Sequence, residues 1–443
     1  MADLKRTDLA LRAERAILVQ AAPYWDRYEA DLTFEELENL ARTAGAVIVG
    51  GLRQHLNKPH PRHYDGKGKL QELAALCESL KPDVVICDDE LSPSQIRHLE
   101  ASLDVKVVDR AEVILDIYAR HASSKLARLQ VELAQLEYEF PRLTRMWTHL
   151  DRTAGGTFGG PVGGGIGVRG PGERQLETDR RTVERRIYDL RKELDTIERQ
   201  HHTAAEARHE KFAAVALVGY ANAGKSSLLN ALTGAQVSVR DRLFETLDTR
   251  TRRWELPGGQ EVVLSDTVGF VRKFPHHLAA SFHATLEEVR EADLLLHVVD
   301  VSKHETEQEI NAVNAVLDEV GCLHKPTVYL MNKVDLVDDF SEAAAVKNLV
   351  DDLICTSAVT GEGLDELRAR VAEWAETRHQ EFVVRAGVEN GRLLSFLHDN
   401  GQVLEQRCQD ASMEVRVRMH PRMVGVVRGM GGEVSQPPAH SLP

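Results

Sequence analysis

Apolar runs that alternate with amphipathic stretches open the chain and predict a first α/β domain. Short apolar runs typical of buried parallel strands occupy 16–20, 46–51, 83–88 and 105–109. The stretch 34–46 between two of them carries its apolar residues at helical spacing. We therefore expect an N-terminal α/β domain with a largely parallel sheet over residues 1–120.

Leucine stripes then replace this alternation and predict two long helices. Apolar residues recur at spacings of three and four at Leu126, Leu129, Leu133, Leu136 and Phe140, and again at Ile187, Leu190, Leu194 and Ile197. Such stripes form the seam between paired helices, so we expect an antiparallel helical hairpin over 121–210. Ten of the 18 residues at 155–172 are glycine, which predicts a tip loop that cannot order itself alone.

The pattern returns to α/β from 211 to 377. Apolar runs, each followed by a loop and a helical stretch, stand at 213–219, 261–267, 293–300 and 326–332. Buried parallel strands with crossover helices have this pattern. The rest, 378–443, holds one helix candidate at 392–401 and one alternating strand at 413–419, so we expect a small C-terminal α/β domain with a disordered tail after about Gly429.

Charge is unevenly distributed along the chain. Fifty-five basic residues face 69 acidic ones, a net charge of -14 that argues against indiscriminate nucleic-acid binding. Between Arg142 and Lys192, however, eleven basic residues stand against six acidic ones. A glycine-rich loop at the tip of a basic helical arm is typical of a segment that becomes ordered when it binds RNA. A plain flexible linker is the alternative.

Hydropathy gives no sign of a membrane protein. No apolar run approaches the roughly 20 residues that a membrane helix needs. The first twenty residues mix acids and bases and do not have the pattern of a secretory signal. We expect a cytoplasmic protein, and a monomer.

The phosphate-binding pattern G-x-x-x-x-G-K-S begins at the last residue of the run 213–219. Its residues are Gly219, Tyr220, Ala221, Asn222, Ala223, Gly224, Lys225 and Ser226, with Ser227 next in the helix. The amides of such a loop and of the following helix cradle phosphates. Lys225 is expected to reach the β- and γ-phosphates, and the Ser226 hydroxyl to bind Mg²⁺.

A second segment for the phosphate and the metal ion begins at the end of the run 261–267. It consists of Asp266, Thr267, Val268 and Gly269. The carboxylate of Asp266 can hold Mg²⁺ through water, and the Gly269 amide can meet the γ-phosphate, so loss of that phosphate would release the segment.

A switch loop must also supply a hydroxyl to Mg²⁺. Thr246 is our candidate, within the segment Phe244, Glu245, Thr246, Leu247 and Asp248, and Thr249 and Thr251 are alternatives. No residue is identified as catalytic, although Lys225, Thr246 and Gly269 would support hydrolysis.

Phe270 stands where many GTPases place the glutamine that orients the attacking water. A phenyl ring cannot orient water. We therefore expect slow hydrolysis by the protein alone and faster hydrolysis with a partner.

Base recognition is predicted at the end of the run 326–332. The segment Asn332, Lys333, Val334 and Asp335 reads N-K-x-D, and Asp335 can accept hydrogen bonds from N1 and N2 of guanine. Adenine has no such donor pair, so GTP is favoured over ATP. The guanine O6 atom is expected to lie against the backbone of a second guanine segment, which consists of Ser357, Ala358 and Val359.

These motifs, GY-x-NAGKSSL, LFETLD, DTVGF, NKVD and TSA, stand behind RGPGE-x-QLETDRR at 169–181. Together they resemble the HflX family of bacterial GTPases over nearly the whole chain, as do HPRHYDGKGK at 60–69 and WTHLDR at 147–152. The chain departs from the family pattern at Thr249, usually proline, and at Glu245 and Arg174, usually alanine and threonine.

The resemblance implies an α/β domain with a helical arm, a GTPase domain and a small C-terminal domain. It also implies binding to the 50S ribosomal subunit and its 23S rRNA, splitting of stalled or idle ribosomes under stress, and GTP hydrolysis stimulated by the ribosome. Two alternatives stay open: a ribosome-assembly or tRNA-modification GTPase, and a GTP-responsive scaffold with little turnover.

Overall fold

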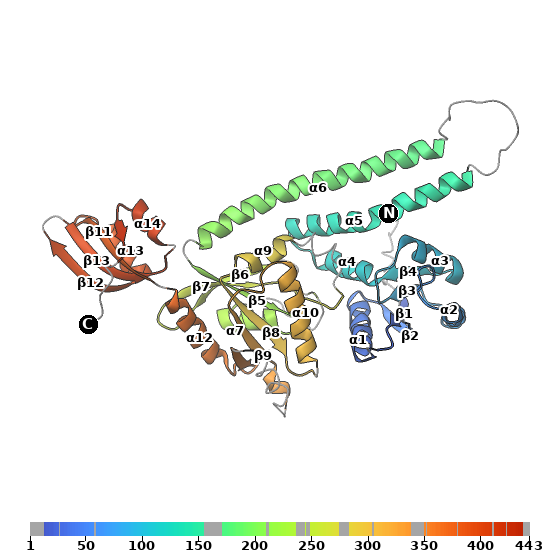
Figure 1. Cartoon of the computed structure of the whole chain (residues 1–443), viewed down its shortest axis with the longest axis horizontal. Helices are drawn as coiled ribbons and strands as arrows, with labels where there is room; N and C mark the ends of the chain where they lie inside the picture. The colour runs from blue at the N-terminus through green and yellow to red at the C-terminus, as the bar shows by residue number, and fades with distance from the viewer. Residues whose placement is uncertain are drawn as a thin grey trace, which may run out of the picture.

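The computed structural model describes residues 13–436 with gaps. The backbone lies outside the description at 26, 57–58, 155–170, 210–211, 236–243, 245–248, 274–282, 304, 338–349, 351, 379, 410–411 and 422. The side chains of 142–154, 171–179, 201–202, 204–209 and 283–286 lie outside it as well. The described chain forms three sheets and one helical arm (Figure 1).

The N-terminal domain is a parallel sheet covered on both faces. Its strands, in the order β2-β1-β3-β4, are β1 (Arg15–Ala22), β2 (Val47–His55), β3 (Val84–Cys87) and β4 (Lys106–Asp109). The helices that follow them are α1 (Arg27–Thr43), α2 (Lys67–Leu80), α3 (Pro93–Leu103) and α4 (Arg110–His121). β1 is apolar on both faces because helices cover both faces of the sheet. Leu18 packs toward α1 and α4, whereas Ile17 and Val19 pack toward α2 and α3. The predicted parallel sheet is confirmed.

Two long helices form the arm. They are α5 (Lys125–Ala154) and α6 (Pro171–His209), which run out and back beside each other (Figure 1). Their seam is made by Leu129, Leu133, Leu190 and Leu194, all buried, so the predicted hairpin is confirmed. The predicted loop 155–172 is too long at its end, because α6 begins at Pro171, where the fixed φ of proline favours a helix start. The remainder, 155–170, lies outside the described residues.

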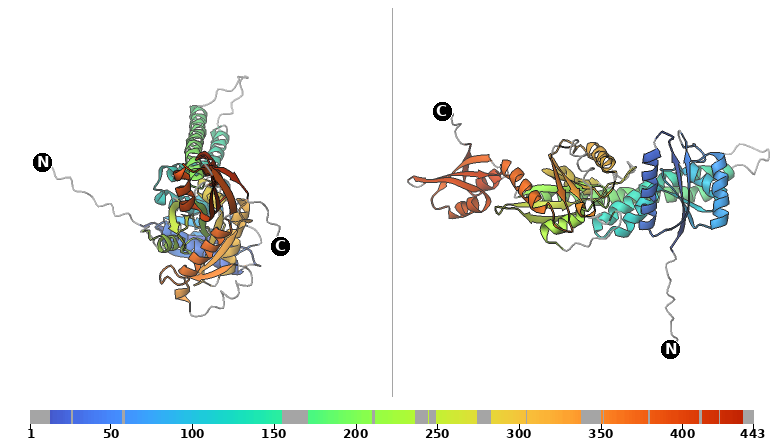
Figure 2. Two further views of the ribbon diagram at one scale, coloured as in Figure 1. Left: turned by 90° about the vertical axis from the view of Figure 1, so that its left-hand side faces the viewer. Right: turned by 90° about the horizontal axis from the view of Figure 1, so that it is seen from below.

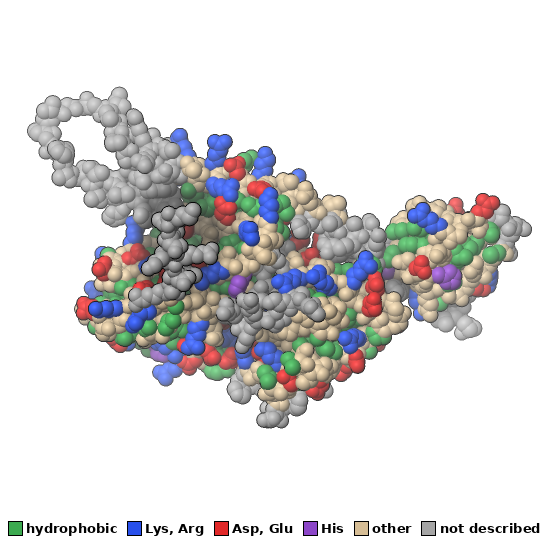
Figure 3. Space-filling model, turned by 180° about the vertical axis from the view of Figure 1, so that it is seen from behind, with side chains coloured by type: hydrophobic (Ala, Val, Ile, Leu, Met, Phe, Trp, Pro, Cys, Tyr) green, Lys and Arg blue, Asp and Glu red, His purple; other side chains and the backbone are tan. Residues whose placement is uncertain are grey.

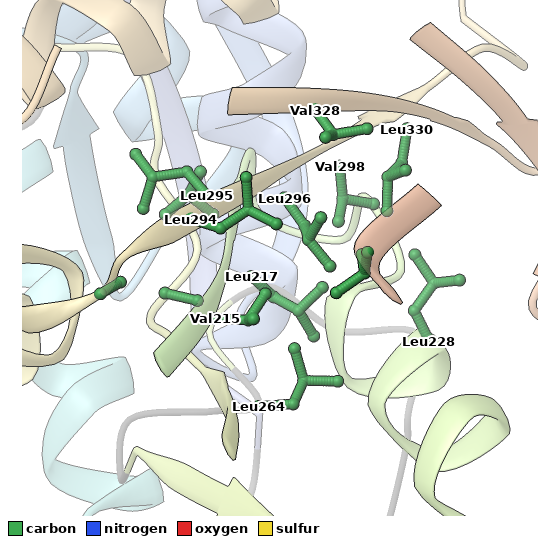
Figure 4. Packing of buried hydrophobic residues seen from close by; sticks show 14 of the residues in the cluster. Val215, Leu217, Leu228, Leu264, Leu294, Leu295, Leu296, Val298, Val328 and Leu330 are labelled. Atoms are coloured by element: carbon green, nitrogen blue, oxygen red, sulfur yellow. The ribbon is translucent and has the colours of Figure 1, made fainter. Parts of the chain in front are cut away.

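The second sheet along the chain belongs to the expected GTPase domain and has six strands in the order β10-β9-β8-β5-β7-β6. They are β5 (Ala213–Gly219), β6 (Arg250–Glu255), β7 (Glu261–Asp266), β8 (Leu294–Asp300), β9 (Thr327–Asn332) and β10 (Leu353–Thr356), all parallel except for the antiparallel pair β6 and β7. The described helices are α7 (Lys225–Thr233), α9 (His283–Glu291), α10 (Thr306–Glu319), the 3-10 turn η1 (Val334–Leu336) and α12 (Leu364–Thr377). Figure 4 shows the core between sheet and helices, where Leu217, Leu264 and Leu296 of neighbouring strands face Leu228 of α7. The carboxyl ends of the parallel strands therefore lie at one edge, where ligands of such sheets bind.

The C-terminal domain is an antiparallel sheet in the order β12-β13-β11-β14, with two helices. Its elements are β11 (Gln380–Gly387), α13 (Gly391–Asn400), β12 (Gln402–Gln409), β13 (Ser412–Met419), α14 (Met423–Gly429) and β14 (Glu433–Ser435). The predicted end of order at about Gly429 is wrong, because β14 pairs with β11. Gly432 allows this return: an added Cβ there would lie 2.8 Å from the Val427 side chain.

The N-terminal and C-terminal domains lie at opposite ends of the GTPase domain, and the arm runs alongside (Figures 1 and 2). The proposed domain boundaries after 120, 210 and 377 stay predictions. Within the described helices, none is long and apolar enough to cross a membrane.

Candidate GTP-binding site

The phosphate-binding pattern forms a tight loop between β5 and α7. The backbone at Gly224 has φ 99°, and an added Cβ would lie 2.2 Å from Asn332 Nδ2. At Gly219, with φ 152°, an added Cβ would lie 2.2 Å from the Val298 carbonyl oxygen. Glycine is thus required at both positions by close contacts with the strands behind them. The loop closes against the first turn of α7, the geometry that binds phosphate.

Lys225 lies inside this loop. Its side chain is buried, and Nζ donates to the carbonyl oxygens of Gly219 at 3.1 Å and Tyr220 at 2.8 Å. Burial lowers the pKa of Lys225 to about 8, against the opposing effect of the carboxylates of Asp266 and Glu309. The ammonium is therefore held close to where phosphates would lie, in surroundings that disfavour its charge until an anion arrives.

This pKa predicts a pH dependence of GTP binding. Bound phosphates favour the charged amine, so the complex has the higher pKa and binding takes up a proton once the pH exceeds about 8. The association constant should then fall with rising pH, by up to about tenfold per pH unit. Titration calorimetry between pH 7 and 9 in buffers of different ionisation enthalpy measures the proton uptake directly. An association constant that does not change across this range would contradict it.

The predicted Mg²⁺ ligands Ser226 and Asp266 lie together. The Ser226 hydroxyl donates to Asp266 Oδ2 at 2.6 Å, and Asp266 is fully buried at the end of β7. Next to it, Thr267 Oγ1 donates to the Leu217 carbonyl oxygen at 2.7 Å, which fixes the segment on β5. A hydroxyl and a carboxylate are the hard oxygen donors that suit Mg²⁺. Thr246, the third predicted ligand, lies outside the described residues, as do Glu245, Leu247 and Asp248.

The segment that follows Asp266 packs on the phosphate loop. Ala221 N donates to the Phe270 carbonyl oxygen at 2.7 Å, and Phe270 N donates to the Gly219 carbonyl oxygen at 3.2 Å. Gly269 lies so close that an added Cβ would be 2.7 Å from Ala221 Cα and 3.0 Å from Lys225 Nζ. The Phe270 ring is buried in the core of the GTPase domain. The backbone of Phe270 is thus bonded to the phosphate loop, and its buried side chain cannot orient an attacking water.

The predicted guanine segments also meet. Asn332 Nδ2 donates to the Ala223 carbonyl oxygen at 2.8 Å, and Ala358 N donates to Asn332 Oδ1 at 3.3 Å. The Ser357 hydroxyl donates to Asp335 Oδ1 at 2.5 Å, which orients the carboxylate. Asn332 thereby connects the phosphate loop to the second guanine segment, 357–359.

The two valines of the predicted guanine segments differ in exposure. Val359 is 85% exposed, whereas the Val334 side chain packs into a buried cluster with Val299, Val301, Ile310 and Met331, so it supports the loop from the core. Lys333 Nζ donates to Asp300 Oδ2 at 2.6 Å. Asp300 was missed by sequence reasoning, although it ends a strand at the same sheet edge as Asn332.

The Tyr220 side chain serves the domain interface. Its hydroxyl donates to Glu36 of α1, and the Arg272 amide donates to both, at 2.8 Å to Tyr220 Oη and 3.2 Å to Glu36 Oε1. This leaves only the Tyr220 backbone for the nucleotide predicted to touch it. Sequence reasoning missed this partner because Glu36 lies 184 residues away.

Arg110 and Lys273 complete this interface. The buried Arg110 guanidinium donates to Glu36 at 2.6 Å, to Asp88 at 2.8 Å and to the Arg272 carbonyl oxygen at 3.1 Å. From the GTPase domain, Lys273 Nζ donates to Asp88 at 2.8 Å and Asp89 at 2.6 Å. Charged groups of the N-terminal domain therefore bind Arg272 and Lys273, which follow Gly269 closely along the chain.

Replacing Arg110 by methionine should destabilise the N-terminal domain. The change leaves Glu36 and Asp88 buried without their guanidinium, a loss of about 3–5 kcal/mol in the free energy of unfolding. Hydrogen exchange of α1 and β3 measures it. Arg120→Met on the same helix is the control, since that side chain is 56% exposed and should cost at most about 0.5 kcal/mol. Equal losses in both variants would contradict the assignment.

Comparisons with known proteins agree with this geometry. Three family models match in succession: "GTP-binding GTPase N-terminal" at 31–119, "GTP-binding GTPase Middle Region" at 121–208 and "50S ribosome-binding GTPase" at 214–333. A GTP-binding protein from Sulfolobus solfataricus, solved in complex with GDP, is similar at 24% identity and a TM-score of 0.40, covering 81% of this chain and 98% of that one. That TM-score is too low to bear on function.

Relatives match over almost the full length. GTPase HflX of Caldanaerobacter subterraneus is 42% identical over 93% of this chain and 92% of its own. GTPase HflX of Escherichia coli is 39% identical over 92% of this chain and 93% of its own. The chain belongs to the HflX family of GTPases, and it is itself a GTPase with a ribosome-binding type of GTPase domain.

Proposed function

We propose that this GTPase binds the 50S ribosomal subunit and uses GTP to split or rescue stalled and idle ribosomes. The observation that carries the proposal is the arm, a helical hairpin that presents exposed arginine and lysine side chains along α6. Figure 3 shows lysine and arginine side chains standing along it. On α6 the exposed basic residues are Arg180, Arg181, Arg185, Arg186, Arg191, Lys192 and Arg199.

The arm suits a deep RNA-lined site. At 39 residues, α6 is about 58 Å long and leads to β5, so its first turn lies far from the GTPase domain. Several arginines pair with carboxylates of the arm itself, such as Arg186 with Glu132 at 2.7 Å and Arg191 with Glu137 at 2.7 Å. These exposed pairs are weak, so their guanidinium groups can turn to rRNA phosphates. Contact with 23S rRNA is part of the proposal.

The nucleotide sets whether the protein is docked. Bound Mg²⁺ would neutralise phosphate charge, with Ser226 and Thr246 as direct ligands and Asp266 acting through water. The phosphates lie on the loop 219–227 and the guanine on the segments of Asn332 and Ser357. GTP favours the docked state, and hydrolysis favours release by no more than the difference in affinity between the two states. The protein acts as a monomer.

Sedimentation of ribosomes tests the proposal. The protein with a non-hydrolysable GTP analogue should convert 70S particles into 30S and 50S subunits and should travel with the 50S peak. A variant with Arg180, Arg181 and Arg185 changed to glutamate should bind at least about tenfold more weakly, since three phosphate contacts are reversed. The matched control changes three exposed arginines of the C-terminal domain, Arg385, Arg392 and Arg407, to glutamate.

Other outcomes favour the alternatives. Intact 70S particles, with the protein bound to precursor subunits or to tRNA, would replace splitting with assembly or tRNA modification. Binding without any turnover would favour a GTP-responsive scaffold, for which the buried Phe270 ring is the one supporting observation.

A further inference from the structure

Tyr188 is an exposed aromatic residue on the arm. Its side chain is 66% exposed, whereas Leu190 and Leu194 of the same helix are buried in the seam with α5. Successive residues of a helix are about 100° apart, so Tyr188 lies about 160° around α6 from Leu190. The ring therefore points away from α5 and does not pack in the seam of the hairpin.

The helix α6 forms the outer side of the arm. α5 packs on the N-terminal domain, because Ala127, Val131 and Ala134 share a buried cluster with residues of α1 and α4. α6 lies on the far side of α5 from that domain (Figure 1). The face of α6 that carries Tyr188 is therefore open to a partner.

Basic residues stand on the same face as Tyr188. Arg181, Arg185, Tyr188 and Lys192 follow one another at spacings of four, three and four residues, and all four are exposed. Such spacings place side chains in one row along a helix, here about 16 Å long. We call these four residues the outer stripe. The stripe combines one aromatic ring with three positive charges.

The two cations nearest to the ring are not engaged by carboxylates of the arm. Within the described part of the chain, neither the Arg185 guanidinium nor the Lys192 ammonium has a hydrogen-bond or ion-pair partner. Glu184, four residues before Tyr188, is paired with Arg180 instead, at 3.1 Å. Phosphate could therefore bind these two cations without displacing an ion pair.

An exposed tyrosine between such cations suits single-stranded RNA. Aromatic rings stack on unpaired bases, and basic side chains on either side neutralise the phosphates that flank the base. Double-stranded RNA keeps its bases stacked inside the helix, so it offers no base to the ring. The whole chain carries a net charge of -14, so attraction to RNA requires a local basic stripe of this kind.

A second exposed tyrosine has different neighbours. Tyr28 on α1 is 50% exposed, but three residues after it stands Asp31, which pairs with Arg53 at 2.5 Å. At Tyr188 the residues three positions before and four positions after are both basic. An exposed ring alone therefore does not make such a site, because the flanking cations are needed for the phosphates.

We propose that the outer stripe of α6 binds an unpaired base of RNA, with the base stacked on the Tyr188 ring and the adjoining phosphates bound by Arg185 and Lys192. Binding of single-stranded RNA stands on the outer stripe alone. That this RNA belongs to the 50S subunit rests on the proposed function.

Binding of a fluorescein-labelled oligouridylate, measured by anisotropy over a series of salt concentrations, tests the stripe without ribosomes. Tyr188→Ala should weaken binding by about 5- to 100-fold, since the stacking of one base is lost. The slope of log affinity against log salt should stay the same, because no cation is removed. Tyr188→Phe should keep the wild-type affinity, whereas Tyr188→Leu should not, because leucine offers no flat face for stacking.

The cations have a different signature. Arg185→Gln and Lys192→Gln should each lower the magnitude of the salt slope by about 0.7, the change for one phosphate contact on a single strand. Tyr28→Ala is the matched control and should leave the affinity within about twofold. Wild-type affinity in Tyr188→Ala or Tyr188→Leu, or no binding of oligouridylate by the wild-type chain at low salt, would overturn the proposal.

Photo-cross-linking on 50S subunits then identifies the partner. With p-benzoylphenylalanine in place of Tyr188, irradiation should attach the arm to an unpaired nucleotide of 23S rRNA. Attachment to a ribosomal protein, or to nothing while the chain is bound, would overturn the assignment to rRNA. If the wild-type chain does not bind 50S subunits, the proposed function fails, whereas the oligouridylate measurements still test the stripe.

Discussion

Replacing Lys225 by alanine should weaken GTP binding by at least about 100-fold. A hydrogen bond to a charged group contributes about 1.5–3 kcal/mol, and Lys225 is expected to reach two phosphates. Two such bonds correspond to a loss of roughly 100-fold or more. The buried position strengthens the effect, since other cations cannot easily take its place.

The measurement is nucleotide binding by titration calorimetry, with Arg252→Ala as control. Arg252 is exposed on the edge strand β6 of the same domain, so its removal should change affinity by less than about twofold. The Lys225 variant also loses two hydrogen bonds to loop carbonyl groups, so circular dichroism should first show that it is folded. Retained tight binding in the folded variant would refute the phosphate assignment.

The second large effect is a change of base preference in Asp335→Asn. The asparagine amide would face the N1 and N2 donors of guanine with a donor of its own, and affinity for GTP should fall by about 100- to 1,000-fold. Xanthine offers an oxygen where guanine has the 2-amino group, so binding of xanthosine triphosphate should improve. The Ser357 hydroxyl can still donate to the side-chain oxygen of the introduced asparagine, which keeps the loop in place.

Competition between GTP and xanthosine triphosphate for a fluorescent nucleotide measures this preference. Asp365→Asn provides the control, because that carboxylate is 97% exposed on α12 of the same domain. A base preference that stays the same in Asp335→Asn would show that this carboxylate does not read the base.

Residues that act within one short segment could be predicted from the sequence. The loop from Gly219 to Ser226 needs its glycines and lysine at fixed spacing, because the same few amides and one ammonium must converge on phosphate. The parallel strands of this domain could be predicted as well, since burial on both faces leaves a continuous apolar run in each of them. Asp266 and Asn332 each end one of these strands, and the parallel sheet brings such strand ends to the edge at which the loop lies.

Contacts between distant segments could not be predicted in this way. His121 Nδ1 donates to the Phe244 carbonyl oxygen from 123 residues away, and neither residue stands in a pattern that announces the other. Tyr220 was predicted to bind the nucleotide because it lies in the motif, whereas the bond from its hydroxyl to Glu36 of another domain was not foreseen. Such pairs follow from how domains dock, which local spacing does not encode.

The C-terminal domain was underestimated for a different reason. β12 is an edge strand with mostly exposed side chains, so it lacks the apolar alternation by which β13 was recognised. β14 has only three residues and follows two glycines, a composition typical of a loop. Its strand character comes from pairing with β11, a tertiary contact.

The most direct test of the account is GTP turnover by the purified protein alone and with added 30S, 50S and 70S particles, at fixed Mg²⁺ and salt. We expect slow turnover alone, because Phe270 cannot orient water, and strong stimulation by 50S and 70S particles but not by 30S. Turnover that saturating 50S subunits leave unchanged would contradict a ribosome-coupled switch and would favour an assembly factor or a scaffold.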